Sequence, residues 1–571
     1  MNWHFLNPDP KLVNRLKSEF NSSEIIARVL ANRGIESVES SKTFFNPQLD
    51  QLHNPYDMQD MDKATDRVME SISANKTIMI YGDYDVDGTT GASMLYLALT
   101  ELGANITPYI PNRESEGYGL STVGIDIAAE LGVDLIISCD CGINAFEPIK
   151  YANSLKIDVI ITDHHIPDDT LPEAFAILNP KRTDCDYPFK NLCGGGVAFK
   201  LVCALTEKMN QPIDLMHKYL DLVTLGTCAD MVTIKDENRV IVKHGLKLLA
   251  NDSKPGITAL LKLVGLENKS ISVGQLVFGV APKINAAGRL GDANRSVELL
   301  TTSNKQRAKS LADELMQENQ KRQIIQQEVV DAAFNMIHAN IDLKNERAIV
   351  LAGKEWHPGV IGIVASKVKE EFHRPAVIVS YDKNGIGKGS ARSISGLDLY
   401  DALAASSKHL IDFGGHAMAA GLTVKEKSFN DFKKTFIEYV NNTINDEHLI
   451  QSIKLEGVLK LKDINSRFID FLNKLAPYGP GNMRPSFASK KVEIVGNPRV
   501  VGNGDHIIFK VRQSQKVISA IGFNMSEHYE KLIKGLSVDL AYVVEVNEWQ
   551  GRESVQLNVR DIKMSDKLKG L

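Results

Sequence analysis

The chain has 571 residues, of which 43% are hydrophobic and 24% are charged, and its formal net charge is -5. This length exceeds what one hydrophobic core supports, so several domains are expected, and the balanced composition excludes a disordered or fibrous chain. The mild acidity argues against a protein that coats nucleic acid over its whole surface, although it allows a local basic groove.

Signals for a membrane or for secretion are missing from the sequence. No apolar stretch approaches the roughly 20 residues that a membrane helix requires. The first ten residues, MNWHFLNPDP, lack the basic and apolar regions of a secretory signal. The six cysteines show no paired metal-ligand spacing and are expected to be reduced thiols. The sequence therefore predicts a cytoplasmic protein without membrane contact.

The first half of the chain predicts a helical cap followed by an α/β domain. Residues 1–50 have helical patterns at Ser22–Asn32 and Val38–Phe44 and are expected to cap the domain that follows. Over residues 51–240, short apolar strands alternate with helix-compatible segments, which is typical of a mainly parallel sheet. The expected strands are Thr77–Tyr81, Ile106–Ile110, Asp134–Ser138, Ile157–Ile161 and Phe175–Leu178.

The second half predicts a connector, a smaller α/β domain and a β-domain. Residues 241–345 are expected to be helical, and the narrow apolar stripe from Asn304 to Asn340 predicts one long helix or two in series. A second α/β unit is expected over residues 346–450. Residues 451–571 often alternate with a period of two, which indicates a small β-barrel or sandwich.

Acidic and histidine side chains follow several expected strands at their carboxyl ends. Because parallel strands end at the same edge of a sheet, these groups are expected to lie together. Asp230 ends an apolar segment that is expected to return to this edge as a further strand end. The candidate metal ligands and catalytic residues are Asp83, Asp85, Asp87, Asp140, His164, His165 and Asp230.

This set of side chains predicts a metal centre. A single aspartate at a strand end is usually a turn former or a helix cap. Carboxylates packed as a set would repel one another unless cations compensated their charge. Carboxylate oxygens with imidazole nitrogen suit Mn²⁺ or Mg²⁺, whereas a structural zinc site would usually include thiolates. Two divalent metal ions, Mn²⁺ or Mg²⁺, are therefore expected as cofactors for hydrolysis.

The motifs resemble those of a known superfamily. The segments GDYDVDG, SCD, TDHH and GTCAD, in this order, resemble the four motifs of the DHH phosphoesterases. The segments VAPKINAAGRL, WHPGVIG and GGHAMAAG narrow the resemblance to the RecJ exonucleases. It covers about residues 50 to 560 and implies a parallel-sheet DHH domain, a smaller α/β DHHA1 domain joined by the long helix, and a C-terminal OB-fold barrel.

The resemblance also implies roles for the metal-centre residues. It assigns one ion to Asp85 and Asp140, and the other to Asp87, Asp140, His164 and Asp230. His165 would contact the scissile phosphate. Many family members have a histidine where this sequence has Tyr81, so Asp83 is expected to support the first ion instead, directly or through water.

The candidate substrate-binding residues are Arg113, Arg289, His357, Ser390, Arg392, Gly414, Gly415 and His416. The resemblance implies a pocket for a 5′-terminal phosphate made by Arg113, Ser390 and Arg392, where guanidinium groups can bind phosphate oxygens. It also implies that Arg289 clamps a phosphate near the metals. From the residues alone, Arg113 could equally be a solvated arginine, glycine pairs more often mark turns, and His357 could cap a helix.

Two further groups are open to more than one interpretation. Gly194–Gly196 could present helix N-terminal amides to phosphate, although close helix packing would need the same glycines. Aromatic and basic residues of the C-terminal domain could track a single strand, although barrels also fill their cores with aromatic side chains. The candidates there are Tyr478, Arg484, Phe487, Lys510 and Trp549.

The residues predict metal-dependent phosphodiester hydrolysis without a Ser or Cys nucleophile. The resemblance implies, more specifically, a single-stranded-DNA-specific 5′ to 3′ exonuclease that releases 5′-mononucleotides. The resemblance implies a role in DNA repair and recombination, with a helicase and a single-strand-binding protein as partners, and we expect a monomer. One alternative is a DHH-type phosphodiesterase of short oligonucleotides, although the β-domain favours a longer substrate. Another is a non-catalytic DNA-binding replication scaffold, against which the intact ligand set argues.

Overall fold

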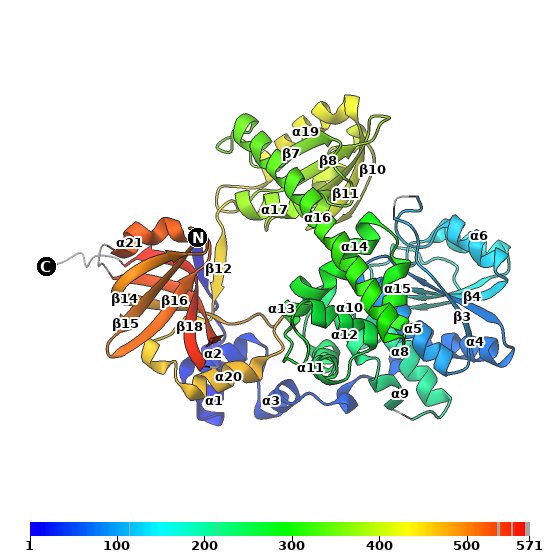
Figure 1. The fold of residues 1–571 in the computed structure, drawn as a ribbon, viewed down its shortest axis with the longest axis horizontal. Coiled ribbons are helices and arrows are strands. Elements are labelled where there is room, and N and C mark those ends of the chain that lie inside the picture. Colours follow the sequence, from blue (N-terminus) through cyan, green and yellow to red (C-terminus); the bar gives the residue numbers. More distant parts are fainter. Residues whose placement is uncertain (114, 213, 534–536, 550–551, 566–571) are drawn as a thin grey trace.

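A computed structural model describes residues 1–113, 115–212, 214–533, 537–549 and 552–565. These residues form three lobes (Figure 1). The catalytic lobe contains the first α/β domain and the helical region, the upper lobe contains the second α/β domain, and the barrel lobe contains the C-terminal β-domain together with the N-terminal helices. No helix among the described residues is both long and apolar enough to cross a membrane.

The sheet of the catalytic lobe is wholly parallel, with the strand order β3-β2-β4-β5-β6. All five predicted strands are confirmed with small differences at their ends. Helices cover both faces, which explains why the central strands are apolar on both sides. The strands are β2 (Thr77–Gly82), β3 (Asn105–Tyr109), β4 (Val133–Cys139), β5 (Asp158–Thr162) and β6 (Ala176–Leu178), and the helices are α4 (Met61–Ser73), α5 (Val86–Glu101), α6 (Thr122–Glu130), α7 (Phe146–Ser154), α8 (Gly194–Lys208) and α9 (Asp214–His217).

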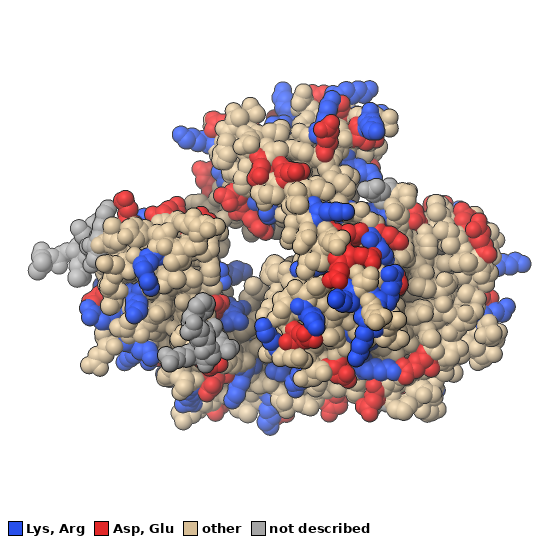
Figure 2. Space-filling model, viewed as in Figure 1, with Lys and Arg blue, Asp and Glu red and all other residues tan. Residues whose placement is uncertain are grey.

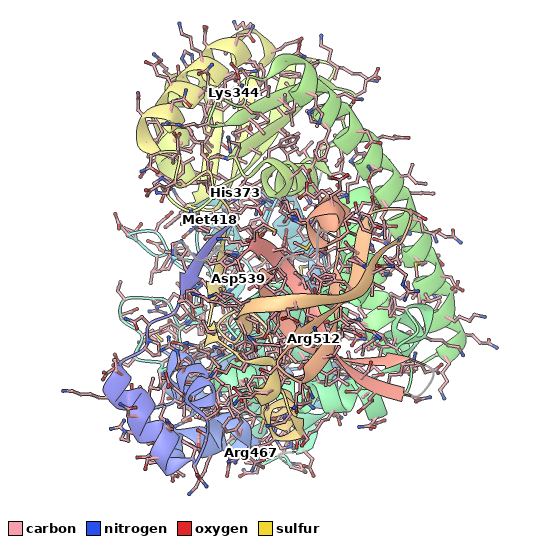
Figure 3. The ribbon with its side chains drawn as sticks, turned by 90° about the vertical axis from the view of Figure 1, so that its left-hand side faces the viewer. Lys344, His373, Met418, Arg467, Arg512 and Asp539 are labelled. Carbon is pink, nitrogen blue, oxygen red and sulfur yellow. The ribbon has the colours of Figure 1, made fainter. Side chains whose placement is uncertain are left out.

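The helical region packs against the α5 and α8 side of this sheet and ends in the predicted connector. The connector is a single helix of 36 residues, α16 (Lys305–Asn340). In Figure 3 it runs along one side of the molecule, down from the lobe that carries Lys344 and His373. The preceding helices are α10 (Leu220–Ala229), α11 (Asp236–Asn251), α12 (Pro255–Leu263), α13 (Val273–Gln275), the π-helix η3 (Leu276–Val280), α14 (Ala281–Leu290) and α15 (Asn294–Thr301).

The upper lobe is the predicted second α/β unit, with a mixed sheet in the order β10-β11-β9-β8-β7. Val329, Ala333 and Ile337 of α16 share a buried core with α17 and β7, so the connector is part of this lobe as well. The strands are β7 (Ile349–Lys354), β8 (Ala376–Tyr381), β9 (Ile386–Arg392), β10 (Leu410–His416) and β11 (Ala419–Lys425), and the helices are α17 (Ile361–Phe372), α18 (Leu399–Ala404) and α19 (Phe429–Thr443).

The C-terminal β-domain is a closed barrel, as the alternating sequence pattern allowed. β14 pairs with both β15 and β17, and this second pairing closes the sheet. The elements are β12 (Ser452–Leu455), β13 (Gly457–Val458), α20 (Ser466–Leu475), β14 (Ser486–Val501), β15 (His506–Gln513), β16 (Lys516–Gly522), α21 (Tyr529–Ile533), β17 (Val538–Trp549) and β18 (Arg552–Met564).

The expectation that residues 1–50 cap the following domain does not hold for the first two helices, although residues 44–50 contact α11. The predicted helices exist as α1 (Pro10–Glu19), α2 (Glu24–Asn32) and α3 (Val38–Phe45). However, α1 and α2 bury their apolar faces in the core of the barrel lobe, and β1 (Asn2–Phe5) pairs with β12. Helical periodicity shows which face of a helix is apolar but not which surface it meets, so the pattern could not choose between the two domains.

Candidate active site

The candidate metal ligands gather at the carboxyl edge of the catalytic sheet. Asp83 and Asp140 follow β2 and β4, and His164 follows β5. Asp85 is the N-cap of α5, where its carboxylate accepts the N–H of Gly88 at 3.1 Å, and Asp87 lies in the first turn. The strand ends and one helix start therefore deliver these side chains to a common point.

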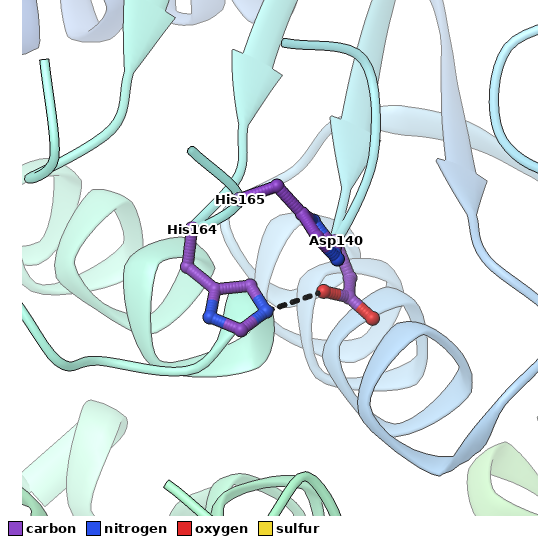
Figure 4. A group of neighbouring side chains, drawn as sticks. All are labelled: Asp140, His164 and His165. Carbon is purple, nitrogen blue, oxygen red and sulfur yellow. Dashed lines mark ion pairs between the residues drawn. The ribbon is translucent and has the colours of Figure 1, made fainter. Parts of the chain in front are cut away.

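Asp140 and His164 form the middle of the cluster. His164 Nε2 lies 3.2 Å from Asp140 Oδ1 and 3.6 Å from Asp230 Oδ2. Figure 4 marks the contact between His164 and Asp140 with a dashed line. Ligand atoms within 4.8 Å of one another form three overlapping groups. These groups are Asp83, Asp85 and Asp140; Asp87, His164 and Asp230; and Asp140, His164 and His165.

The electrostatics of the cluster fit a bound cation. Burial, followed by the charges of neighbouring carboxylates, raises the pKa of Asp140 well above its usual value and that of Asp230 to about 8. Burial lowers the pKa of His164 to about 4. Within the described part of the chain, Asp83 Oδ1, Asp140 Oδ1 and both ring nitrogens of His164 are buried without a hydrogen-bond partner. Such oxygen and imidazole donors suit divalent cations of the Mn²⁺ or Mg²⁺ type.

Asp230 belongs to a helix rather than to a strand end as expected. It is the C-cap residue of α10, which packs against α5 and so reaches the sheet edge from the side. A short apolar run does not distinguish a buried helix from a buried strand, and here the run before Asp230 is a buried helix. The structure nevertheless brings Asp230 into the cluster.

The amides of α8 bind a carboxylate of the cluster. Gly194 and Gly195 donate their N–H groups to Asp87, at 2.6 and 3.1 Å. The phosphate interpretation of Gly194–Gly196 is therefore not supported, and the contact to Asp87 is one that the sequence did not reveal. The close-packing interpretation fits Gly194, since a Cβ at this position would lie 2.4 Å from the Cβ of Asp140.

This packing predicts unequal effects of two neighbouring alanine substitutions. Gly194→Ala is expected to lower activity and Mn²⁺ affinity by about 10- to 100-fold, because changes to groups that orient metal ligands typically cost this much. Gly196→Ala is the matched control, because its Cβ would meet the side chain of Leu192 at an ordinary 3.4 Å. Isothermal titration with Mn²⁺ and initial rates would measure both effects. Equal behaviour of the two variants would contradict this account.

Asp163 orients the second histidine. Its Oδ1 atom lies 2.7 Å from His165 Nδ1 and also accepts the backbone N–H of His164 and of His165. Burial lowers the pKa of His165, but the hydrogen bond and charge of Asp163 outweigh this effect and raise it overall. Asp163 stands inside the TDHH motif, yet the sequence did not indicate this positioning contact.

Tyr81, at the position where many family members have histidine, lies away from the cluster. Its buried hydroxyl donates to Gly119 O at 3.1 Å and accepts the N–H of Ser121 at 3.2 Å. Glu116 accepts hydrogen bonds from Tyr109, Ser121 and the amide of Asn112. Tyr81 and Glu116 thus anchor the loop between β3 and α6, which carries Arg113. Asp83 lies in the group with Asp85 and Asp140.

Two arginines from different parts of the catalytic lobe lie near the cluster. The Arg113 guanidinium stacks 5.1 Å from the ring centroid of Tyr84. Arg289, at the end of α14, donates to Gly359 O at 3.1 Å. Burial, followed by the charge of Arg113, lowers the pKa of Arg289 to about 10, and Asp85 opposes this effect. Positive charge therefore stands beside the acidic cluster.

The upper lobe supplies the remaining candidates. Ser390 and Arg392 both lie on β9, with Arg392 Nη1 3.0 Å from Ser390 Oγ, against the start of α17. Gly414, Gly415 and His416 lie on β10, whose partner β11 pairs with β9 beside Arg392. His357 Nδ1 accepts the N–H of Gly359 at 3.0 Å, which is a turn contact ahead of α17 and not a helix cap, because the N-cap residue of α17 is Val360.

The barrel candidates divide into several groups. Phe487 is fully buried in the barrel core, so its assignment as a DNA contact is wrong. The Arg484 guanidinium lies 4.8 Å from the ring centroid of Tyr478, and Lys510 is exposed. The side chain of Trp549 lies outside the described residues.

This fold and this cluster define a DHH-type phosphoesterase, and the family models agree. The DHH family, N-terminal domain model matches residues 77–227, the DHHA1 domain model matches residues 345–442, and the RecJ OB domain model matches residues 455–561. The Bacillus subtilis single-stranded-DNA-specific exonuclease RecJ is 36% identical over 99% of this chain and 71% of its own length. The Escherichia coli RecJ is 34% identical over 94% of this chain and 95% of its own length. The chain belongs to the RecJ family.

Solved structures of this family also superpose on the chain. RecJ from Thermus thermophilus in complex with Mn²⁺ matches with a TM-score of 0.85 and 28% identity, covering 100% of this chain and 80% of that chain. The Mg²⁺ complex of the same protein matches with a TM-score of 0.79 and the same identity, covering 79% of that chain. The predicted cofactors, Mn²⁺ or Mg²⁺, are the ions bound in these relatives.

Proposed function

We propose that the protein is a metal-dependent, single-stranded-DNA-specific 5′ to 3′ exonuclease that releases 5′-mononucleotides. The observation that carries this proposal is the buried cluster around Asp140 and His164. Among the described residues, Asp83 Oδ1, Asp140 Oδ1 and both ring nitrogens of His164 are buried there without a hydrogen-bond partner. Membership of the RecJ family supports it independently.

The ligand set supports a two-metal site. Asp83, Asp85 and Asp140 would hold one ion, and Asp87, Asp140, His164 and Asp230 would hold the other. When bound, two such ions lower the pKa of water and stabilise negative charge on a phosphate that is being cleaved. Glycine amides fix Asp87, so one ligand is oriented before any ion binds.

The remaining residues would bind and orient the DNA. The hydrogen bond and charge of Asp163 favour the protonated imidazolium of His165, which would donate from Nδ1 to Asp163 and from Nε2 to the scissile phosphate. Arg289 would offset charge on the same phosphate. Arg113, Ser390 and Arg392 would bind a 5′-terminal phosphate. This contact would fix the distance from the 5′ end to the cleaved bond, so digestion would proceed in the 5′ to 3′ direction.

Domain roles and cellular context follow from this function. We propose that residues 51–240 and 346–450 form the catalytic cleft, that residues 241–345 connect them, and that residues 451–571 bind nucleic acid. The protein would act as a monomer in the cytoplasm, in DNA repair and recombination. A helicase would supply unwound strands, and a single-strand-binding protein would occupy the neighbouring DNA.

The two alternative functions have less support. A phosphodiesterase of short oligonucleotides would not need the closed barrel, which the chain possesses. A non-catalytic scaffold would not need to retain every carboxylate of the cluster around Asp140.

Digestion of end-labelled DNA tests the proposal. With Mn²⁺ or Mg²⁺, we expect immediate release of 5′-labelled mononucleotide from single strands, no release from blunt duplexes, and complete loss of activity with a chelator. Release of the 3′ label first would contradict the polarity. Inert long DNA with rapid dinucleotide cleavage would favour the short-substrate enzyme, and metal-independent DNA binding without cleavage would favour the scaffold.

A further inference from the structure

The connection between α10 and α11 joins the metal cluster to the barrel lobe. It comprises residues 231–235 and directly follows Asp230, the C-cap residue of α10. Met231 leaves the helix in the left-handed conformation, with a φ of 59°, and Ile234 is fully buried three residues later. Helix α10 therefore holds Asp230 from one side, and this connection holds it from the other.

A turn of the barrel lobe, residues 479–482, is docked on this connection. The backbone N–H of Ile234 donates to Pro480 O in the turn at 2.7 Å. The fit is close, because a Cβ on Gly481 would lie 2.0 Å from Thr233 Oγ1. Figure 2 shows the barrel lobe meeting the catalytic lobe below an open space between them. The contact that joins the two lobes thus lies four residues from a candidate metal ligand.

Arg239 fastens the same two lobes near the start of α11. Its guanidinium donates to Ala476 O at 2.9 Å and to Pro477 O at 3.3 Å, and its Nε atom donates to Phe44 O at 2.7 Å. The guanidinium carbon also lies 3.8 Å from the centroid of the Phe44 ring. Burial lowers the pKa of Arg239 to about 10, and carbonyl oxygens and an aromatic face receive its charge. Two separate segments of the barrel lobe are therefore tied to residues 231–239.

Residues 231–239 also brace a second metal ligand. Asn238 Nδ2 donates to Thr233 O at 3.0 Å and to Asn191 O at 2.6 Å. Asn191 leads into the N-terminus of α8, whose amides hold Asp87. Asp87 and Asp230 belong to the same group of candidate ligand atoms. A displacement of residues 231–239 would therefore reach two ligands of one ion.

We propose that the docked turn positions Asp230, so that the barrel lobe holds one of the two metal sites in its binding geometry. Ile234, Arg239 and Gly481 are positioning residues in this role, because they act on the ion through the backbone of residues 231–235. This inference rests on the proposed two-metal function and adds a link between the barrel lobe and the metal cluster. Coupling between two sites is reciprocal, so an ion at Asp230 strengthens the docking contact by the same factor.

Gly481→Ala tests this proposal in the full-length protein. The added methyl group is expected to displace Thr233 and to weaken Mn²⁺ binding at one of the two sites about tenfold, which is the scale for altered support of a metal ligand. Isothermal titration would measure both affinities. In cleavage assays, kcat is expected to fall at limiting Mn²⁺ and to recover at saturating Mn²⁺, while KM for a single strand stays unchanged.

Gly496→Ala is the matched control for this variant. Gly496 also lies in the barrel lobe and has a φ of 70°, against 73° for Gly481, so alanine causes similar backbone strain at both positions. No described atom lies within 4 Å of a Cβ at Gly496. Gly496→Ala is therefore expected to keep the wild-type Mn²⁺ affinity, even if it lowers the melting temperature in chelator as much as Gly481→Ala does.

A second substitution is expected to rescue Gly481→Ala. Thr233→Ala removes the oxygen that the new methyl group would meet and leaves a Cβ 3.2 Å away. The double variant is therefore expected to regain most of the tenfold loss in Mn²⁺ affinity, while Thr233→Ala alone stays close to the wild type. A double-mutant cycle on Mn²⁺ affinity would measure this coupling.

Hydrogen exchange of the wild-type protein tests the reciprocal effect without any variant. Mn²⁺ is expected to slow exchange of the Ile234 amide about tenfold relative to chelator, the same factor as the coupling of the two sites. Mass spectrometry of a peptide covering residues 231–239 would measure the rate. A peptide covering β15, residues 506–513, is the control, and its exchange is expected not to depend on Mn²⁺.

The outcomes separate the two proposals. The positioning inference would be overturned by wild-type Mn²⁺ affinity of Gly481→Ala, by equal losses in Gly496→Ala, or by a lack of rescue with Thr233→Ala. Exchange of the Ile234 amide that ignores Mn²⁺ would overturn it even if Gly481→Ala fails to fold. None of these results would affect the nuclease assignment. A wild-type protein that neither binds Mn²⁺ nor cleaves single strands would overturn the proposed function, and the inference with it.

Discussion

Asp140→Asn is expected to reduce kcat about a thousandfold or more, which is the scale of metal-based stabilisation of a phosphoryl transition state. Asp140 belongs to two of the three groups of candidate ligand atoms, so its replacement affects both ions. Asparagine is the appropriate substitute, because residue 140 has a φ of 64° and asparagine tolerates this left-handed conformation. Initial rates on labelled single strands would measure the change.

Stability gives an independent readout for the same variant. Burial and neighbouring carboxylates raise the pKa of Asp140, so its ionised form destabilises the metal-free fold near neutral pH. In chelator, Asp140→Asn is therefore expected to unfold at the same temperature as the wild type or above it. Mn²⁺ should raise the melting temperature of the wild type more than that of the variant. A variant that unfolds earlier in chelator would show that Asp140 supports the fold instead.

Arg392→Ala is expected to lower kcat/KM about a hundredfold on single strands with a 5′-phosphate, since charge-assisted contacts to phosphate contribute about 2 to 5 kcal/mol. Arg392 is half-buried, and burial lowers the pKa of its guanidinium, so an anionic ligand would stabilise the charged side chain. Rates on matched strands with a 5′-phosphate or a 5′-hydroxyl would measure this preference.

The 5′-hydroxyl strand is the control for the Arg392 variant. If Arg392 binds the terminal phosphate, Arg392→Ala and removal of that phosphate abolish the same contact. On the 5′-hydroxyl strand, the kcat/KM of the variant is therefore expected to be close to that of the wild type. Equal losses on both strands would instead indicate a contact to an internal phosphate or a general disturbance of β9.

Much of the fold follows from local sequence patterns. The strands of the catalytic sheet are buried on both faces and appear as apolar runs, and α16 has a clear apolar stripe. The metal-centre candidates were predictable because Asp83, Asp140 and His164 follow strands that must end together in a parallel sheet. Local chemistry and topology were sufficient for these features.

Contacts between distant segments were not predictable. The amide of Gly194 reaches Asp87 across 107 positions of sequence, and the Glu116 network depends on how a loop folds back on itself. The helices α1 and α2 join a domain more than 400 positions away, as the hydrogen bond from Arg28 to Glu456 O illustrates. The apolar faces of α1 and α2 could pack against either the barrel lobe or the catalytic lobe, so only the tertiary structure shows which lobe they join.

The pairing of β1 with β12 makes the barrel lobe a unit that is tethered twice. The chain leaves this lobe after the N-terminal helices, passes through the catalytic and upper lobes, and returns at β12 (Figure 1). A single proteolytic cut between residues 445 and 451 would therefore not release the barrel strands. After such a cut, β1, α1 and α2 would still contact the barrel, and they would remain covalently joined to the catalytic lobe. Separation of the barrel from the catalytic lobe is thus limited by two restraints in parallel.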